Sequence, residues 1–303
     1  AWLPSGGTAA TASGLCAGTY TCTVTGAGGC TGQVTVTITQ PPQITLTPTQ
    51  TNVTCNGVCN GAASVVATGG TGVYTYTWAP APGAGQGTAN ATGLCAGTYT
   101  VTVSSPAGCT RTQAFTITQP PAITLTPTQT NVTCNGVCNG SASVVATGGN
   151  GTYTYVWAPA PGAGQGTANA TALCAGTYTV TVSSPAGCTL TQSYTITQPP
   201  AITLTPTQTN VTCFGACTGT ASVVATGGNG TYTYLWAPGG QTTASITGQC
   251  AGSYTVTVSS PAGCTRTQTY TITQPPQITI TPTQTNVTCF GSCNGTATGV
   301  ASG

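Results

Sequence analysis

Apolar and polar residues alternate with a period of two along most of this chain. In residues 177–182, Tyr178, Val180 and Val182 fall on one side of an extended backbone, and threonines fall on the other. Thr is β-branched and suits an exposed pleated surface. A second alternating run, 188–197, follows the turn sequence Ser-Ser-Pro-Ala-Gly. The two runs are therefore predicted to pair as a hairpin.

Further extended runs precede this hairpin. Residues 142–149 and 152–157 are separated by Gly and Asn residues and are predicted to form another pair. The run 123–133 contains Pro127, which has no amide hydrogen and therefore belongs at a sheet edge. No helical periodicity is sustained anywhere. Six or seven short strands per period predict an all-β fold, an immunoglobulin-like antiparallel β-sandwich.

The same pattern recurs in tandem. The string ITLTPTQTNVTC begins at Ile44, Ile123 and Ile202, and returns as ITITPTQTNVTC at Ile278, so the spacings are 79, 79 and 76 residues. Each period ends in Gln-Pro-Pro, a stiff extended connector. We expect a piece of a longer repetitive protein, built as beads on a stiff string. The expected divisions are a half-repeat at 1–42, repeats at 43–121, 122–200 and 201–276, and a half-repeat at 277–303.

One Trp and one Tyr recur at fixed positions in each whole repeat. The Trp lies on the third predicted strand, and the Tyr follows an Ala-Gly-Thr or Ala-Gly-Ser motif at a strand start. Immunoglobulin-like sandwiches bury such a Trp and tie such a Tyr hydroxyl to a chain corner. We interpret these residues as core anchors rather than as platforms for ligands. They are Trp78, Trp157, Trp236, Tyr99, Tyr178 and Tyr254.

Charged side chains are almost absent, which excludes several functions. The chain has two Lys or Arg residues, no Asp, Glu or His, and a net charge of +2. Nucleic-acid binding requires clustered Lys and Arg, and acid–base catalysis requires groups that this chain lacks. No apolar run is long enough to span a membrane. We therefore expect no enzyme activity, no cofactor, no metal site, no nucleic acid and no membrane span.

The 17 cysteines carry the main chemical signal. Paired zinc-binding spacings are absent, and no His is available to activate a catalytic thiol. Disulfides in an oxidising, extracellular compartment explain four cysteines per whole repeat. The cysteines expected in disulfides are Cys55, Cys59, Cys95, Cys109, Cys134, Cys138, Cys174, Cys188, Cys213, Cys217, Cys250, Cys264, Cys289 and Cys293. Cys22 replaces a valine and is interpreted as a small, inward-facing hydrophobe.

The sandwich restricts how these cysteines can pair. Cys134, Cys138 and Cys174 are expected at one end of a repeat, whereas Cys188 is expected at the other end, about 26 Å away for a strand of roughly eight residues. A disulfide needs Cα atoms within about 7 Å. Cys174 is therefore expected to bond Cys134 or Cys138. A local bond between Cys134 and Cys138 is the alternative.

Cys188 is then left to bond a cysteine of the preceding repeat. The predicted partner is Cys55 or Cys59, whichever is not bonded to Cys95. Such a bond would join successive repeats and resist bending.

These motifs resemble a known family. The pattern VTCNG or VTCFG, then ATGGNGTYTY, LCAGTYTVTV, PAGCT and TITQPP, is similar to the SprB repeat. The family occurs in repetitive cell-surface adhesins of gliding bacteria, so the resemblance implies an immunoglobulin-like sandwich, export to the cell surface and a role in adhesion, gliding or filament formation. The chain has no carboxylate side chains, which argues against Ca²⁺ sites between its repeats.

The leading functional expectation is a structural one. Near-identical repeats are typical of a shaft that spaces an adhesive tip from the cell, in which stability comes from each unit and its neighbour interface. The expected partners are neighbouring repeats or further copies of the chain. The alternative is a multivalent module that binds carbohydrate or a surface. Phe214 and Phe290, which replace Asn in other repeats, are its candidate exposed aromatics.

Overall fold

A computed structural model describes residues 1–303 as strands joined by turns. The chain has no helix with the length and apolarity needed to cross a membrane. The first segment forms one sheet in the order β1-β2-β3, and the last segment forms the hairpin β22-β23. Their bounds are Trp2–Leu3 (β1), Gly18–Thr25 (β2), Thr31–Ile38 (β3), Thr279–Thr285 (β22) and Thr296–Ser302 (β23).

Each whole repeat contains six strands in two antiparallel three-stranded sheets. In the first repeat they are β4 (Thr45–Thr51), β5 (Gly61–Thr68), β6 (Thr75–Ala79), β7 (Asn90–Leu94), β8 (Gly97–Ser104) and β9 (Thr110–Ile117). In the second they are β10 (Thr124–Thr130), β11 (Gly140–Thr147), β12 (Thr154–Ala158), β13 (Asn169–Leu173), β14 (Gly176–Ser183) and β15 (Thr189–Ile196). In the third they are β16 (Thr203–Thr209), β17 (Gly219–Thr226), β18 (Thr233–Ala237), β19 (Ser245–Gln249), β20 (Gly252–Ser259) and β21 (Thr265–Ile272).

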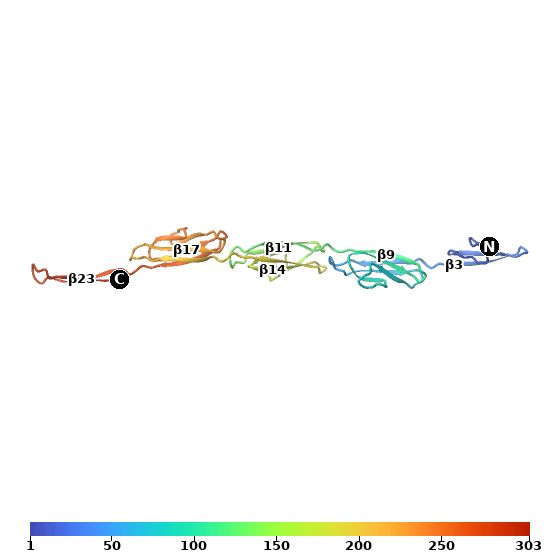
Figure 1. Cartoon of the computed structure of the whole chain (residues 1–303), viewed down its shortest axis with the longest axis horizontal. Coiled ribbons are helices and arrows are strands. Elements are labelled where there is room, and N and C mark those ends of the chain that lie inside the picture. The colour runs from blue at the N-terminus through green and yellow to red at the C-terminus, as the bar shows by residue number, and fades with distance from the viewer. The chain divides into compact units, whose positions relative to one another are not determined.

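The strand order corrects one expectation about pairing. In the third repeat the sheets run β16-β17-β19 and β18-β20-β21, so β17 and β18 belong to different layers. The same holds for β11 and β12, which alternation had suggested as a pair. Figure 1 shows the two layers of the second repeat, with β11 in one sheet and β14 in the other. The turn after β17 contains Gly227, Gly228 and Gly230, all with positive φ. These glycines let the chain cross to the other sheet instead of folding back as a hairpin.

The core lies between the two sheets and is built around the recurring Trp. Trp236 is 1% exposed, and its ring centroid lies 5.3 Å from that of Tyr270 at an interplanar angle of 37°. The indole Nε1 donates to the Thr243 carbonyl oxygen at 2.9 Å. A tilted aromatic pair with its polar atom satisfied can be buried at low cost. Trp78 and Trp157 occupy the same place in the first and second repeats, each 2% exposed.

Loops protect the open edges of each sandwich. In the second repeat, the Trp157 amide donates to Gln165 Oε1 at 3.0 Å, and Gln165 Nε2 donates to the Trp157 carbonyl at 3.2 Å. Ala163 and Thr171 exchange two backbone hydrogen bonds. An exposed sheet edge is a template for aggregation, and a covering loop is one way to block it. This protection is valuable in a chain with almost no charge.

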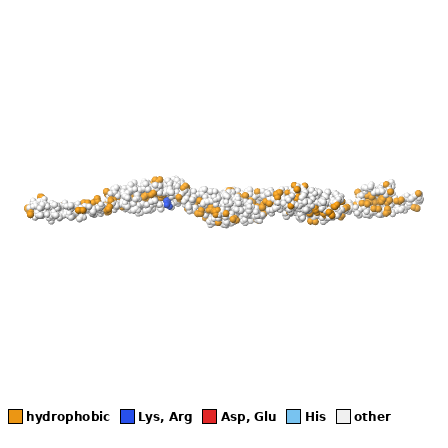
Figure 2. All heavy atoms as spheres, turned by 60° about the horizontal axis from the view of Figure 1, so that its bottom comes forward, with side chains coloured by type: hydrophobic (Ala, Val, Ile, Leu, Met, Phe, Trp, Pro, Cys, Tyr) orange, Lys and Arg blue, Asp and Glu red, His pale blue; other side chains and the backbone are white.

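Hydroxyl groups cover the outer face of the first sheet. Thr124 and Thr147 lie opposite each other with their hydroxyl oxygens 2.6 Å apart, and Thr128 and Ser143 repeat this arrangement at 2.6 Å. Cross-strand hydroxyl pairs stabilise a sheet without burying apolar surface. The face shown in Figure 2 is accordingly mostly white, with scattered hydrophobic patches and one small patch of positive charge.

The chain divides into two compact units that cut across the repeat boundaries. One contains Ala1–Ile123, Gly148–Thr152 and Ser184–Cys188, and the other contains the remaining residues. The first unit thus includes turns of the second repeat, together with the first repeat. A covalent bond explains this grouping, because Cys188 is disulfide-bonded to Cys55.

Candidate functional site: the joint between repeats

A short loop between the first two strands of each repeat holds two cysteines. In the second repeat this loop runs from Cys134 to Cys138. Asn139 closes it, since its Oδ1 accepts from the Thr133 amide at 3.1 Å and its Nδ2 donates to Thr133 Oγ1 at 2.7 Å. Cys138 bonds Cys174, with the Cα atoms 3.9 Å apart. The loop is therefore fastened to its own repeat and leaves Cys134 for another partner.

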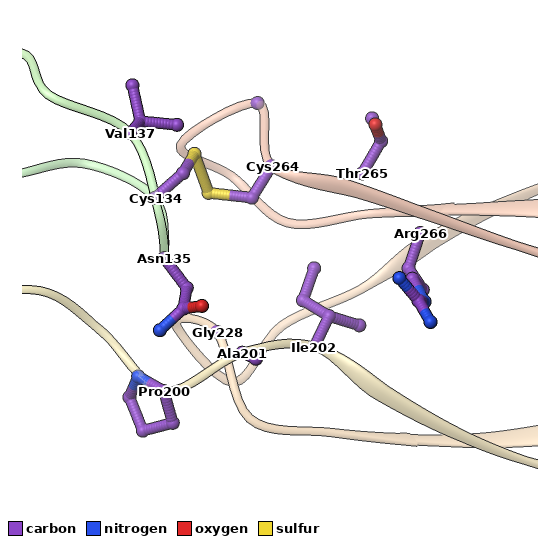
Figure 3. A pocket seen from close by; sticks show the side chains of 11 residues that line it. Cys134, Asn135, Val137, Pro200, Ala201, Ile202, Gly228, Cys264, Thr265 and Arg266 are labelled. Carbon is purple, nitrogen blue, oxygen red and sulfur yellow. A yellow bond between two sulfur atoms is a disulfide. The ribbon is translucent and has the colours of Figure 1, made fainter.

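A second disulfide joins successive repeats. Cys134 bonds Cys264, which lies in the turn between β20 and β21 of the third repeat, and the Cα atoms are 5.5 Å apart (Figure 3). Cys55 bonds Cys188 in the same way, with Cα atoms 5.6 Å apart. These Cα separations are typical of disulfides. Each bond spans a joint that the peptide chain also crosses, so the joint has two covalent connections.

Hydrogen bonds hold the Gln-Pro-Pro connector against the repeat that it leaves. Gln198 Oε1 accepts from the Gly136 amide at 2.9 Å. Asn135 Nδ2 donates to the Pro199 carbonyl at 3.3 Å. Both donors come from the cysteine loop of the second repeat. The first repeat has the same arrangement, in which Gln119 Oε1 accepts from the Gly57 amide at 3.0 Å.

The other end of the connector is held by the repeat that it enters. The Pro200 carbonyl accepts from the Gly228 amide at 2.8 Å. Gly227 beside it has φ +82°, and a Cβ built there would lie 2.0 Å from the Ala201 oxygen. No side chain fits in that space. The connector is thus bound at both ends and passes beside an interrepeat disulfide.

The structure pairs Cys174 with Cys138 rather than with Cys134, and it contains no local bond between Cys134 and Cys138. The five disulfides are Cys55–Cys188, Cys59–Cys95, Cys134–Cys264, Cys138–Cys174 and Cys217–Cys250.

Four cysteines that the sequence predicts in disulfides are free thiols in residues 1–303: Cys109, Cys213, Cys289 and Cys293. The repeat period explains the difference. The cysteine that corresponds to the partner of each falls outside residues 1–303, so no thiol of this chain stands where the bond would form. Cys22 is also free and is partly exposed.

The Trp and Tyr residues predicted as core anchors lie in the sandwich cores and not in the joints between repeats. Tyr254 is 9% exposed, and its hydroxyl donates to the Cys250 carbonyl at 3.1 Å. Tyr99 and Tyr178 are buried at the equivalent positions. Together with the buried Trp residues, these side chains support the strands from which the joint loops project.

Sequence reasoning missed the polar clamp of the connector. Gln198 and Asn135 had been assigned no hydrogen-bonding role. The available signal was the Gln that precedes Pro-Pro in every period: Gln40, Gln119, Gln198 and Gln274. A polar residue kept beside two prolines indicates a specific hydrogen bond, because the prolines themselves cannot donate one.

No group of three or more His, Cys, Asp or Glu side chains is placed to hold a metal. Burial raises the pKa of the Tyr194 and Tyr270 phenols, whose hydroxyls donate to the carbonyls of Ser143 and Ser222 at 2.7 Å. These tyrosines lie in the sandwich interior and serve packing.

Comparison with protein families identifies the repeat. The family described as SprB repeat matches residues 47–83, 126–162 and 205–241, once in each whole repeat. No curated protein matches the chain significantly. SprB repeats and several disulfides are features of secreted or cell-surface proteins of the adhesin type, and such domains are not known as enzymes.

Solved structures with tandem immunoglobulin domains are also similar to this chain. A chain of the complex between Dpr2 Ig1-Ig2 and DIP-Theta Ig1-Ig3 is 12% identical with a TM-score of 0.30, and the match covers 77% of this chain and 100% of that one. The eight N-terminal Ig domains of Down Syndrome Cell Adhesion Molecule are 11% identical with a TM-score of 0.29, covering 88% of this chain and 52% of that one. The insect immune protein hemolin is 10% identical with a TM-score of 0.25, covering 82% and 79% respectively.

Proposed function

This chain carries repeats of the SprB family, and from that premise we propose that it forms part of the shaft of a cell-surface adhesin or filament. The single observation that carries the proposal is the joint between repeats, where a disulfide and a Pro-Pro peptide connect the same two domains. A single flexible peptide would let the domains tumble. Two separate covalent connections restrict bending, because motion about one is opposed by the other.

The clamp on the connector supports the same role. Gln198 and Gly228 hold the connector to the repeats before and after it. These contacts need no charged group, so they do not depend on salt concentration or on pH near neutrality. Such a joint suits a protein that must keep its extension outside the cell.

Repetition gives the proposal a second support. Stability in a tandem array comes from each unit and from its interface with the next one. Here the interface is covalent, so local opening of one repeat leaves the thread unbroken. Near-identical joints also allow length to be added without new interactions. Neighbouring repeats and further copies of the chain are the proposed partners.

The decisive experiment measures stiffness at a joint. Residues 1–303 and the variant C134S/C264S would be compared by rotary-shadowing electron microscopy and small-angle X-ray scattering. The double variant C138S/C174S is the matched control, because it removes a disulfide within a repeat. We expect an extended particle for the parent and a wider distribution of bend angles for C134S/C264S alone. A compact parent particle would rule out the shaft.

A second function is supported by two exposed aromatic residues, Phe214 and the fully exposed Phe290. Phe214 lies in the cysteine loop of the third repeat, where the second repeat has Asn135, and 49% of it is exposed. An exposed ring can stack on a sugar, which favours a multivalent carbohydrate-binding module. A glycan array with the parent and the double variant F214N/F290N tests this alternative. Binding that survives the loss of both rings would remove its structural basis.

A further inference from the structure

We infer that the joint between the second and third repeats contains a binding site for a uronic acid, a sugar unit that carries a carboxylate. This site goes beyond the proposed shaft and does not depend on it. The inference begins with Arg266, one of the two cationic side chains of the chain. The protein has no Asp or Glu, so no acidic side chain can neutralise the guanidinium.

Arg266 has the strand position of an inward-facing residue, but its side chain is exposed because it lies near the end of the sandwich. It is the second residue of β21 and lies opposite Val258, a buried core residue of β20. Leu190 has the same place in β15, opposite Val182. The second repeat therefore folds with an apolar side chain at this position. The fold does not require the positive charge that Arg266 adds there.

A cavity of about 370 Å³ lies beside Arg266. Ligand sites commonly have volumes of roughly 300–1,000 Å³. Figure 3 shows the cavity lining, in which the cysteine loop of the second repeat faces the connector and strands of the third. Asn135 and Val137 come from the loop, and Ile202 and Arg266 come from the third repeat. The Cys134–Cys264 disulfide closes one side.

The chemistry of this lining selects the class of ligand. A guanidinium binds a carboxylate through two parallel hydrogen bonds. Asn135 already uses Nδ2 to hold Pro199, which leaves its Oδ1 to accept from a hydroxyl. Val137 and Ile202 offer apolar surface. A ring with hydroxyls, one apolar face and a carboxylate matches these groups, and a uronic acid has all three.

The rigid joint also lowers the cost of binding. The disulfide and the bound connector fix the two halves of the site before a ligand arrives. A preformed site loses less conformational entropy on binding than a flexible one. A single ion pair at a partly exposed site is weak, so binding of one sugar is expected near a Kd of about 1 mM.

The test uses residues 1–303 labelled with ¹⁵N and titrated with sodium glucuronate. Two arginines give only two Nε–Hε signals, and the variants R266L and R111L assign them. We expect the Arg266 signal to shift to saturation with glucuronate, and not with glucose or with sodium chloride at equal ionic strength. R266L should weaken binding at least about tenfold, a loss of about 1.4 kcal/mol. R111L should bind as the parent does.

Each remaining outcome contradicts the proposal. An equal shift with sodium chloride would mean a screening effect and no site. An equal affinity for an acetylated dipeptide would mean that the carboxylate alone is bound, which excludes a sugar site. Binding by R266L within about twofold of the parent would remove the role of the guanidinium. R266L is expected to fold, because Leu190 occupies the same strand position. Dispersed Trp indole signals would check this.

Discussion

Cys134 and Cys264 lie 130 positions apart in the sequence, and a disulfide brings their Cα atoms to 5.5 Å. The intervening chain completes one repeat, crosses the connector and nearly completes the next. The bond therefore joins the loop between the first two strands of one repeat to the turn between the last two strands of the next repeat. With Cys55 and Cys188 repeating the arrangement, the joint is a regular feature of the array.

The disulfide within a repeat is expected to act on stability. Removing Cys138–Cys174 by C138S/C174S opens a loop with a sequence separation of 36. In the chain-entropy model this lowers the free energy of unfolding of that repeat by about 3–4 kcal/mol. Urea denaturation followed by Trp fluorescence measures the change. C109S removes an exposed free thiol and should leave the transition in place. An unchanged midpoint for C138S/C174S would contradict this account.

Substituting two glycines of one turn should distinguish the cost of backbone strain from the cost of a steric clash with the connector. Both Gly227 and Gly230 have positive φ, but only at Gly227 would a Cβ meet the connector, 2.0 Å from the Ala201 oxygen. Nothing lies within 4 Å at Gly230. G230A should cost about 1–2 kcal/mol from the left-handed backbone alone. G227A should cost about 3–4 kcal/mol, because the connector must also move. Thermal unfolding compares the two, and equal losses would show that the approach is unimportant.

Alkaline pH is expected to destabilise the second and third repeats. Burial raises the pKa of Tyr270 above its ordinary value of 10.0, since the folded protein favours the neutral phenol. The stabilisation is complete below pH 10 and is lost as the pH rises through the folded pKa. The variant Y270F should lose this dependence in the third repeat, at a cost of about 1 kcal/mol for the missing hydrogen bond.

The first repeat is the internal control for that experiment, because Phe115 stands where Tyr270 stands in the third. Free thiols are alkylated beforehand so that disulfides do not exchange at high pH. Unfolding is measured between pH 7 and pH 12 in the parent and in Y270F. The same alkaline loss in both proteins would exclude the phenol as its cause.

The loop that covers β12 is expected to prevent aggregation. Gln165 satisfies the outward amide and carbonyl of Trp157. Q165A leaves both groups without their side-chain partner, which should lower stability by about 1–3 kcal/mol and increase aggregation. Q192A is the control, because Gln192 bonds only the adjacent Ser193 carbonyl. Light scattering during slow heating measures the effect. Equal scattering from the two variants would show that the edge needs no cover.

The sequence by itself determined the repeats, the β class, the buried Trp positions and the restriction on disulfide partners. Each follows from a short-range rule: alternation places Val180 and Val182 inward, and the length of a strand separates Cys188 from Cys174. The identity of the repeat family could be read from its motifs for the same reason. These features need no knowledge of how distant segments meet.

Only the tertiary structure decided how the repeats are joined. The sequence pattern could not choose between Cys134 and Cys138 as the partner of Cys174, because both cysteines lie in the same short loop. The structure bonds Cys138 to Cys174 of the same repeat and Cys134 to Cys264 of the next one. It also paired β11 with β12, although the positive-φ glycines between them send the chain to the other sheet. The roles of Gln198 and Arg266 depend on which backbone and which cavity lie beside them. Those are contacts between residues far apart in sequence, and folding alone brings them together.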